Sequence, residues 1–179
     1  MSSNECIITE CYIDSSLIEV LLYAGRNHVN HQKGNGTVAK RMKDGFGGSF
    51  CIGIIDEDRK ELEYLKEFEV QEETVHLKFW KHRKEAHYII QIRPVIERWI
   101  LNVCEEAGIA LNHEFNLPET LKPLMKISKT RQSKEDIRFI NLFKRMLKVK
   151  CLPVIMLKNR IEELKKENYN LDINELKNG

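Results

Sequence analysis

The stretch Phe50-Cys51-Ile52-Gly53-Ile54-Ile55, which runs directly into Asp56-Glu57-Asp58, places the centre of a sheet in this chain. Six consecutive apolar or small residues are typical of a strand that is covered on both faces. Three acidic residues follow at once. The stretch therefore predicts an α/β sheet flanked by helices, with carboxylates at the carboxyl end of a central strand.

Strand and helix patterns alternate around this stretch. Residues 6–11 predict a short buried strand, and Asp14-Ser15-Ser16 offers capping groups for a helix with an apolar face. Further elements are expected as a short strand near 28–31, a helix from Thr37 to about 43, a charged helical connection over 59–68, and strands over 75–80 and 87–92. This order predicts a mostly parallel central sheet over residues 1–92.

The second half of the chain has a helical pattern. Pro94 suits a first helical position. Further helices are predicted near 118–127, 133–148 and 153–168. We therefore expect residues 93–179 to form a helical extension that packs on the core.

Composition limits the function classes. A chain of 179 residues with 42% hydrophobic content suits one compact unit, and no run approaches the roughly 20 apolar residues of a membrane span. Five widely spaced cysteines without a C-x-x-C pair predict reduced thiols rather than a zinc site or disulfide framework. We expect a soluble, cytoplasmic protein without a membrane partner.

The charge is distributed unevenly. The whole chain carries +2, but residues 120–160 contain twelve Lys/Arg and two acids, Glu135 and Asp136. A basic lobe of this kind suits an anionic partner such as DNA or RNA. A solvated helical surface is the alternative interpretation.

Two acidic pairs follow predicted strands. Glu10 ends the first strand and Asp14 comes four residues later, whereas Asp56 and Asp58 end the central strand. If the two strands are parallel neighbours, these acids converge on one sheet edge. Crowded carboxylates repel one another, and a hard divalent cation, Mg²⁺ or Mn²⁺, would relieve that repulsion.

At these residues the sequence resembles the Toprim family. The stretch from Glu10 to Asp14 is similar to the E-x-x-x-D opening of Toprim domains, and Asp56-Glu57-Asp58 is similar to their strand-borne D-x-D. The resemblance covers about residues 5–92. Cys11 departs from the family, because many members have glycine directly after the glutamate.

The resemblance implies a Toprim-like fold and Mg²⁺-dependent phosphodiester chemistry on nucleic acid, most simply a nuclease. It implies that Glu10, Asp56 and Asp58 bind the metal, with Glu10 as a possible acid/base and Asp14 as support. Related Toprim nucleases work with an ATPase and serve in phage defence. The alternative is therefore a non-catalytic interaction or effector module that works with a partner ATPase.

Several assignments keep a structural alternative. Asp56 and Asp58 would also suit a solvated turn, Glu10 a satisfied structural carboxylate, and Asp14 a helix cap. Glu97 would either complete a metal shell or serve as a first-turn acid. Substrate binding is assigned to four basic residues that are otherwise simply exposed: Lys33, Arg59, Lys60 and Lys81. A flavodoxin-like phosphoacceptor is disfavoured, because no acceptor aspartate and downstream strand-end lysine can be placed.

Overall fold

The computed structural model describes residues 6–23, 29–57 and 62–178, with the backbone alone over 169–178. Within these residues six strands form one sheet in the order β2-β1-β3-β6-β5-β4. The parallel part consists of β2 (Asn30–His31), β1 (Ile7–Thr9), β3 (Cys51–Asp56) and β6 (His87–Ile92). Antiparallel pairing then adds β5 (Leu77–His82) and β4 (Phe68–Glu73). The predicted α/β fold with a mostly parallel sheet is confirmed.

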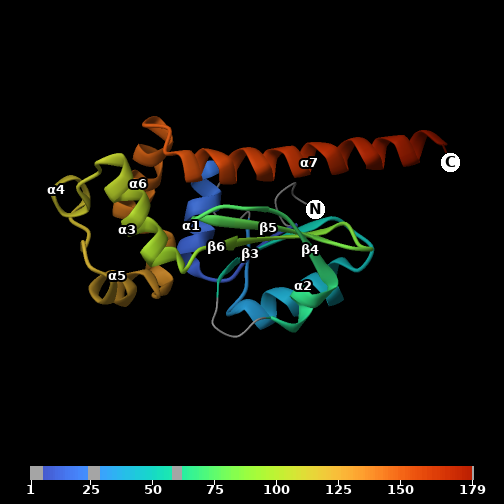
Figure 1. Cartoon of the computed structure of the whole chain (residues 1–179), viewed down its shortest axis with the longest axis horizontal. Coiled ribbons are helices and arrows are strands. Elements are labelled where there is room, and N and C mark those ends of the chain that lie inside the picture. The colour runs from blue at the N-terminus through green and yellow to red at the C-terminus, as the bar shows by residue number, and fades with distance from the viewer. Residues whose placement is uncertain (1–5, 24–28, 58–61, 179) are drawn as a thin grey trace.

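Helices cover both faces of the sheet, as Figure 1 shows. One face packs against α2 (Asn35–Phe46), and the other packs against α1 (Tyr12–Leu21) and the helical second half of the chain. Successive residues of β3 alternate between these layers: Ile52 and Ile54 join the larger core, whereas Cys51 and Ile55 join the smaller one. This two-sided burial explains why β3 is apolar on both faces.

Gly53 lets α2 approach the central strand closely. A Cβ atom at this position would lie 2.8 Å from Met42 Sδ and 3.2 Å from Val38 Cγ1. We expect Gly53→Ala to lower the free energy of unfolding by about 1–3 kcal/mol, because the added methyl group overpacks the layer between β3 and α2. Chemical denaturation monitored by circular dichroism measures this change.

Gly36 provides the matched control for this substitution. It lies in the first turn of α2, where an added Cβ would meet no atom within 4 Å. Gly36→Ala should leave stability unchanged or raise it by up to about 1 kcal/mol, since alanine restricts the unfolded chain. Equal stability losses for the two variants would contradict the packing argument.

The second half of the chain consists of helices that share the larger core with the sheet. They are α3 (Ile96–Ala107), α4 (Leu111–Phe115), α5 (Leu121–Ser128), α6 (Ile137–Lys148) and α7 (Leu152–Asn178), with a 3₁₀ turn at Arg131–Lys134. Phe139 and Phe143 of α6 are fully buried in that core. Figure 1 shows α7 lying across the sheet, with its C-terminal end projecting beyond it. None of the described helices combines the length and apolar character needed to cross a membrane.

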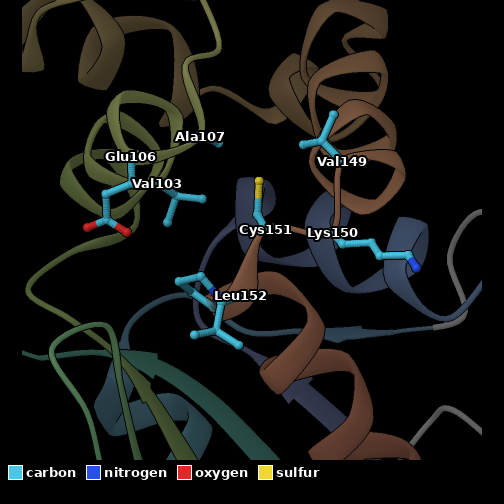
Figure 2. A pocket seen from close by; sticks show the side chains of 8 residues that line it. Val103, Glu106, Ala107, Val149, Lys150, Cys151 and Leu152 are labelled. Carbon is cyan, nitrogen blue, oxygen red and sulfur yellow. The ribbon is translucent and has the colours of Figure 1, made fainter.

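A hollow of about 300 Å³ separates α3 from the turn between α6 and α7. Figure 2 shows Val103 and Glu106 of α3 on one side of it and Cys151 and Leu152 on the other. Cys151 is buried, and burial raises the pKa of its thiol. All five cysteines are free.

Three predicted helix starts are wrong. Helix α1 begins at Tyr12, so its N-cap is Cys11; Asp14 lies inside the first turn, from which its carboxylate still caps the helix by accepting from the backbone N–H of Cys11. Helix α2 begins at Asn35 after Gly34, ahead of Thr37. Helix α3 begins at Ile96, beyond Pro94.

The charged connection over 59–68 is also different from the expected helix. Its described part is a 3₁₀ turn at Glu63–Glu67, and Phe68 already begins β4. The strand was missed because β4 lies at the sheet edge and its residues Glu69–Glu73 are mostly exposed and charged, without an apolar alternation. The short helix α4 was not expected either.

Candidate functional site

Two acids meet where parallel strands β1 and β3 end. Glu10 directly follows β1, and Asp56 is the last residue of β3. The backbone N–H of Asp56 donates to Oε2 of Glu10 over 3.0 Å, which ties the two strand ends together. Because β1 and β3 are direct parallel neighbours, Glu10 and Asp56 lie together at one edge of the sheet, as predicted.

The carboxylate of Asp56 also contacts the start of α3. Its Oδ1 accepts a hydrogen bond from the backbone N–H of Ile96 over 2.9 Å. Ile96 is the first residue of α3, where unpaired N–H groups and the helix dipole favour negative charge. The start of α3 therefore helps to hold the Asp56 carboxylate in place.

Asp14 lies behind this pair in the first turn of α1. It is fully buried, and its Oδ2 accepts from the backbone N–H of Cys11 over 3.1 Å. Its Oδ1 has no hydrogen-bond partner among the described residues. Burial, with the charges of Glu10 and Glu97, raises the pKa of Asp14 to about 7, although the hydrogen bonds from Cys11 oppose this rise.

Repulsion among carboxylates extends to Asp56. Its pKa lies well above the ordinary value because of burial and then the charges of Asp14, Glu10 and Glu97. Glu97, in the first turn of α3, is buried and accepts a 2.5 Å hydrogen bond from Ser128 Oγ of α5. Four acids from three segments of the chain thus lie close enough together to raise the pKa values of Asp14 and Asp56.

The acids border a pocket of about 380 Å³. Glu10, Asp56 and Glu97 line it, and the ammonium-bearing side chains of Lys33 and Lys129 line it as well. Tyr12 and His31 form part of the wall, with their rings stacked at 4.0 Å between centroids. Burial and the nearby charge of Lys134 lower the pKa of His31, which keeps its ring neutral. The pocket therefore combines carboxylates, a neutral imidazole and two exposed cations.

The predicted site residues separate into three groups. Glu10, Asp56 and Lys33 line the pocket, and Asp14 is buried next to it. Lys81 lies elsewhere, on β5, with its Nζ 5.5 Å from the centroid of the Tyr88 ring. The predicted Asp58, Arg59 and Lys60 lie outside the described residues.

Sequence reasoning missed part of the pocket. Tyr12, His31 and Lys129 were not predicted, and Glu97 was left with two interpretations. His31 carried a usable signal, since it ends a short strand that pairs in parallel with β1 and so reaches the same edge. Lys129 carried none, because its position depends on how α5 packs beside α3.

The donor chemistry of the site fits a hard cation such as Mg²⁺. Carboxylate oxygens are the ligands that Mg²⁺ prefers, and the unpaired Oδ1 of Asp14 and the raised pKa of Asp56 both reflect negative charge without a counterion. The described residues contain no group of three His, Cys, Asp or Glu side chains placed to hold one ion. Glu10 and Asp56 alone therefore do not make up a complete ligand set for such an ion.

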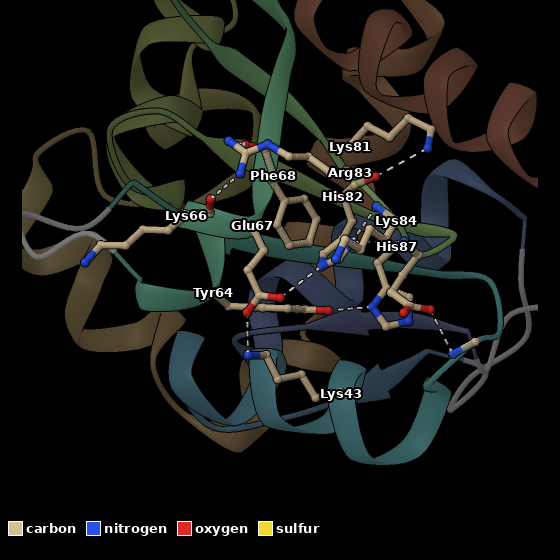
Figure 3. Close-up of polar contacts among 12 residues, drawn as sticks. Lys43, Tyr64, Lys66, Glu67, Phe68, Lys81, His82, Arg83, Lys84 and His87 are labelled. Atoms are coloured by element: carbon tan, nitrogen blue, oxygen red, sulfur yellow. Dashed lines mark hydrogen bonds and ion pairs between the residues drawn. The ribbon is translucent and has the colours of Figure 1, made fainter.

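A second buried polar cluster, on the other side of the sheet, has the opposite character (Figure 3). His87 Nε2 donates to the carbonyl of Phe46 over 2.9 Å, and its Nδ1 accepts from Tyr64 Oη over 2.7 Å. His82 Nδ1 accepts from the backbone N–H of Glu85, and its Nε2 donates to Glu67. Every ring nitrogen of these two histidines has a hydrogen-bond partner, so this cluster stabilises the fold, whereas Oδ1 of Asp14 beside the acidic pocket has none among the described residues.

Comparison with known proteins adds no assignment: no family model, no curated protein and no solved structure matches the chain.

Proposed function

We propose that the chain is a metal-dependent phosphodiesterase that acts on nucleic acid, most simply a nuclease. The observation that carries this proposal is a cluster of four acids beside an open pocket, of which Asp14 and Glu97 are buried and Glu10 and Asp56 are half-buried. Such a cluster opposes folding unless it serves a ligand, and strongly perturbed carboxyl groups in a cleft are characteristic of functional sites. The resemblance of Glu10 to Asp14 and of Asp56 to Asp58 to Toprim motifs supports the same chemistry.

In this proposal Glu10 and Asp56 hold Mg²⁺ or Mn²⁺, with Asp58 as the third predicted ligand and Asp14 as support. When bound, the cation would neutralise the carboxylates and polarise a phosphate oxygen. Lys33 and Lys129 line the pocket as exposed cations, so they are suited to bind the phosphates that flank the reacting group. The stacked Tyr12 and His31 would limit how deeply the substrate enters.

The basic lobe supports nucleic acid as the anionic substrate. Of the twelve Lys and Arg residues in 120–160, seven have no ion-pair partner within the described part of the chain: Lys122, Lys126, Lys129, Arg131, Lys144, Lys148 and Lys150. Unpaired cations of this number favour sequence-independent contact with a phosphate backbone. A reduced cytoplasmic setting would suit the five free thiols.

The metal itself provides the first test. We expect Mg²⁺ and Mn²⁺ to raise the midpoint of thermal unfolding, because binding to the folded state alone stabilises it. The same ions should permit cleavage of labelled single- and double-stranded DNA and RNA, and EDTA should abolish it. Differential scanning fluorimetry and denaturing gels give two independent readouts. A protein that neither responds to the ions nor cleaves any substrate contradicts the proposal.

The alternative is a non-catalytic effector module that works with an ATPase. It would produce a stable complex with such a partner in gel filtration and no cleavage by the chain alone. The exposed basic lobe would then serve protein contact. The unpaired Oδ1 of Asp14 and the raised pKa of Asp56 favour the enzyme, since an interaction surface has no need of clustered like charges.

A further inference from the structure

A second cavity, of about 600 Å³, lies away from the acidic pocket at the corner where α6 ends and α7 begins. Tyr23, which follows α1, contributes to its wall. The other lining residues come from α6, from the turn after it and from the first turns of α7. Neither the proposed metal site nor the histidine cluster uses any of them.

The charge of this cavity has a single sign. Lys144, Lys148, Lys150 and Lys158 line it, and none of the other described residues in its wall is acidic. Lys158 forms an ion pair with Glu162, whereas the other three have no acidic partner within the described chain. Three uncompensated ammonium groups around one hollow favour a ligand with several negative charges.

The same cavity exposes large apolar surfaces. Tyr23 is 83% exposed and Leu152 is 69% exposed, and both line it. Two exposed apolar side chains at one hollow offer apolar surface that a bound ligand can cover. Ammonium groups together with an exposed aromatic ring form the combination that binds a single nucleic-acid strand, because lysines contact phosphates and a ring stacks on a base.

The hollow on the other side of the α6–α7 turn does not share this character. Figure 2 shows Glu106 on its wall and the side chain of Lys150 directed away from Glu106. A carboxylate at that position would repel a phosphate. The anion-binding side of the turn is therefore the side of Tyr23 and Lys144.

Helix α1 connects the two sites. Asp14 lies in its first turn, and Tyr23 lies just beyond its last residue, Leu21. Ten helical residues span roughly 15 Å. A stacked strand rises about 3.4 Å per nucleotide, so a stacked ligand that reaches both sites must be a chain of at least about five nucleotides.

We infer that this cavity binds the single-stranded portion of a nucleic acid, with Lys144 and Lys148 on phosphates and Tyr23 against a base. The choice of nucleic acid rests on the proposed function. The cavity then holds the substrate at a distance from the acidic pocket, so that its loss weakens binding rather than chemistry. A mononucleotide would occupy one of the two sites without reaching the other.

Binding of a fluorescent oligothymidylate of about twelve nucleotides, followed by anisotropy in EDTA, tests this inference without any cleavage. The double variant Lys144→Gln/Lys148→Gln should bind about tenfold more weakly at low salt, and its salt slope should fall by about 1.4, or about 0.7 for each lost phosphate contact. Tyr23→Leu should weaken binding about tenfold, whereas Tyr23→Phe, which keeps the ring, should bind like the wild type. An oligouridylate arm reports the preference for RNA.

Lys40→Gln/Lys84→Gln is the matched control, because it removes two exposed lysines outside the basic lobe of residues 120–160, one on α2 and one in the turn between β5 and β6. It should keep the affinity within about twofold. Equal losses for both double variants would overturn the site, and so would binding to anionic vesicles with no binding to the oligonucleotide.

These outcomes are separable from failure of the proposed function. Oligonucleotide binding that depends on Lys144, Lys148 and Tyr23, without any metal-dependent cleavage, would refute the proposed enzyme. It would leave the inferred binding site in place. Suppose instead that the protein shows metal-dependent cleavage and that the Lys144→Gln/Lys148→Gln variant binds the oligonucleotide as tightly as the wild type. That result would refute the binding site and leave the proposed enzyme in place.

Discussion

Replacing Asp56 by asparagine is expected to lower the rate of Mg²⁺-dependent cleavage by about 1000-fold or more, because a bound divalent ion contributes several kcal/mol to this kind of reaction. Asp56 is the acid that joins the end of β3, the carboxylate of Glu10 and the start of α3. Asparagine keeps an oxygen but loses the charge that a hard cation requires. Single-turnover cleavage of a labelled oligonucleotide measures the rate.

The Asp56→Asn variant should remain folded. The amide oxygen can still accept from the N–H of Ile96, and the backbone bond from Asp56 to Glu10 does not involve the changed side chain. The substitution also removes one of the charges that repel Asp14 and Glu97. Without metal, its free energy of unfolding at neutral pH should therefore equal or exceed that of the wild type.

Two further variants make this result specific. Asp44→Asn removes an exposed acid from α2 and should leave cleavage and stability unchanged. Glu10→Gln keeps the acceptor for the Asp56 N–H and should lose cleavage as Asp56→Asn does. An Asp56→Asn variant that cleaves at the wild-type rate would show that the carboxylate cluster is not the reaction centre.

The sequence allowed the sheet and the meeting of Glu10 with Asp56 to be predicted, because both follow from short-range patterns. A run that is apolar on both faces marks a central strand, and the carboxyl ends of neighbouring parallel strands lie at one edge. The edge strand β4 lacks such a pattern, since its side chains after Phe68 are mostly exposed and it pairs with β5 alone. Its existence depends on a pairing that local sequence does not encode.

The remaining pocket residues depended on tertiary packing. Lys129 and Glu97 reach the pocket because α5 and α3 pack together and Ser128 donates to Glu97. Lys81 was expected near the reacting phosphate, but β5 is separated from β3 by β6 and carries Lys81 to the ring of Tyr88. Such placements are set by which helices and strands become neighbours, and charge patterns along the chain cannot reveal them.

The buried carboxyl of Asp14 should make the metal-free protein less stable as the pH rises. Its pKa is raised from 3.8 to about 7 on folding. Below about pH 4 the carboxyl is protonated in both states. Between that pH and about 7 only the folded state keeps the proton, so each added unit of pH favours unfolding, by up to about 4 kcal/mol in total. Asp56 adds to the same trend, since its pKa is also raised.

Asp14→Asn removes this contribution, because an amide does not titrate. In EDTA the variant should match the wild type within about 1 kcal/mol near pH 4 and exceed it by up to about 4 kcal/mol near pH 8, as measured by urea denaturation at each pH. Asp44→Asn, at an exposed position, should follow the wild type throughout. A wild-type protein that gains stability from pH 4 to 8, or an Asp14→Asn variant with the same pH profile, would mean that Asp14 is ionised at little cost. The cation would then not be needed to neutralise it.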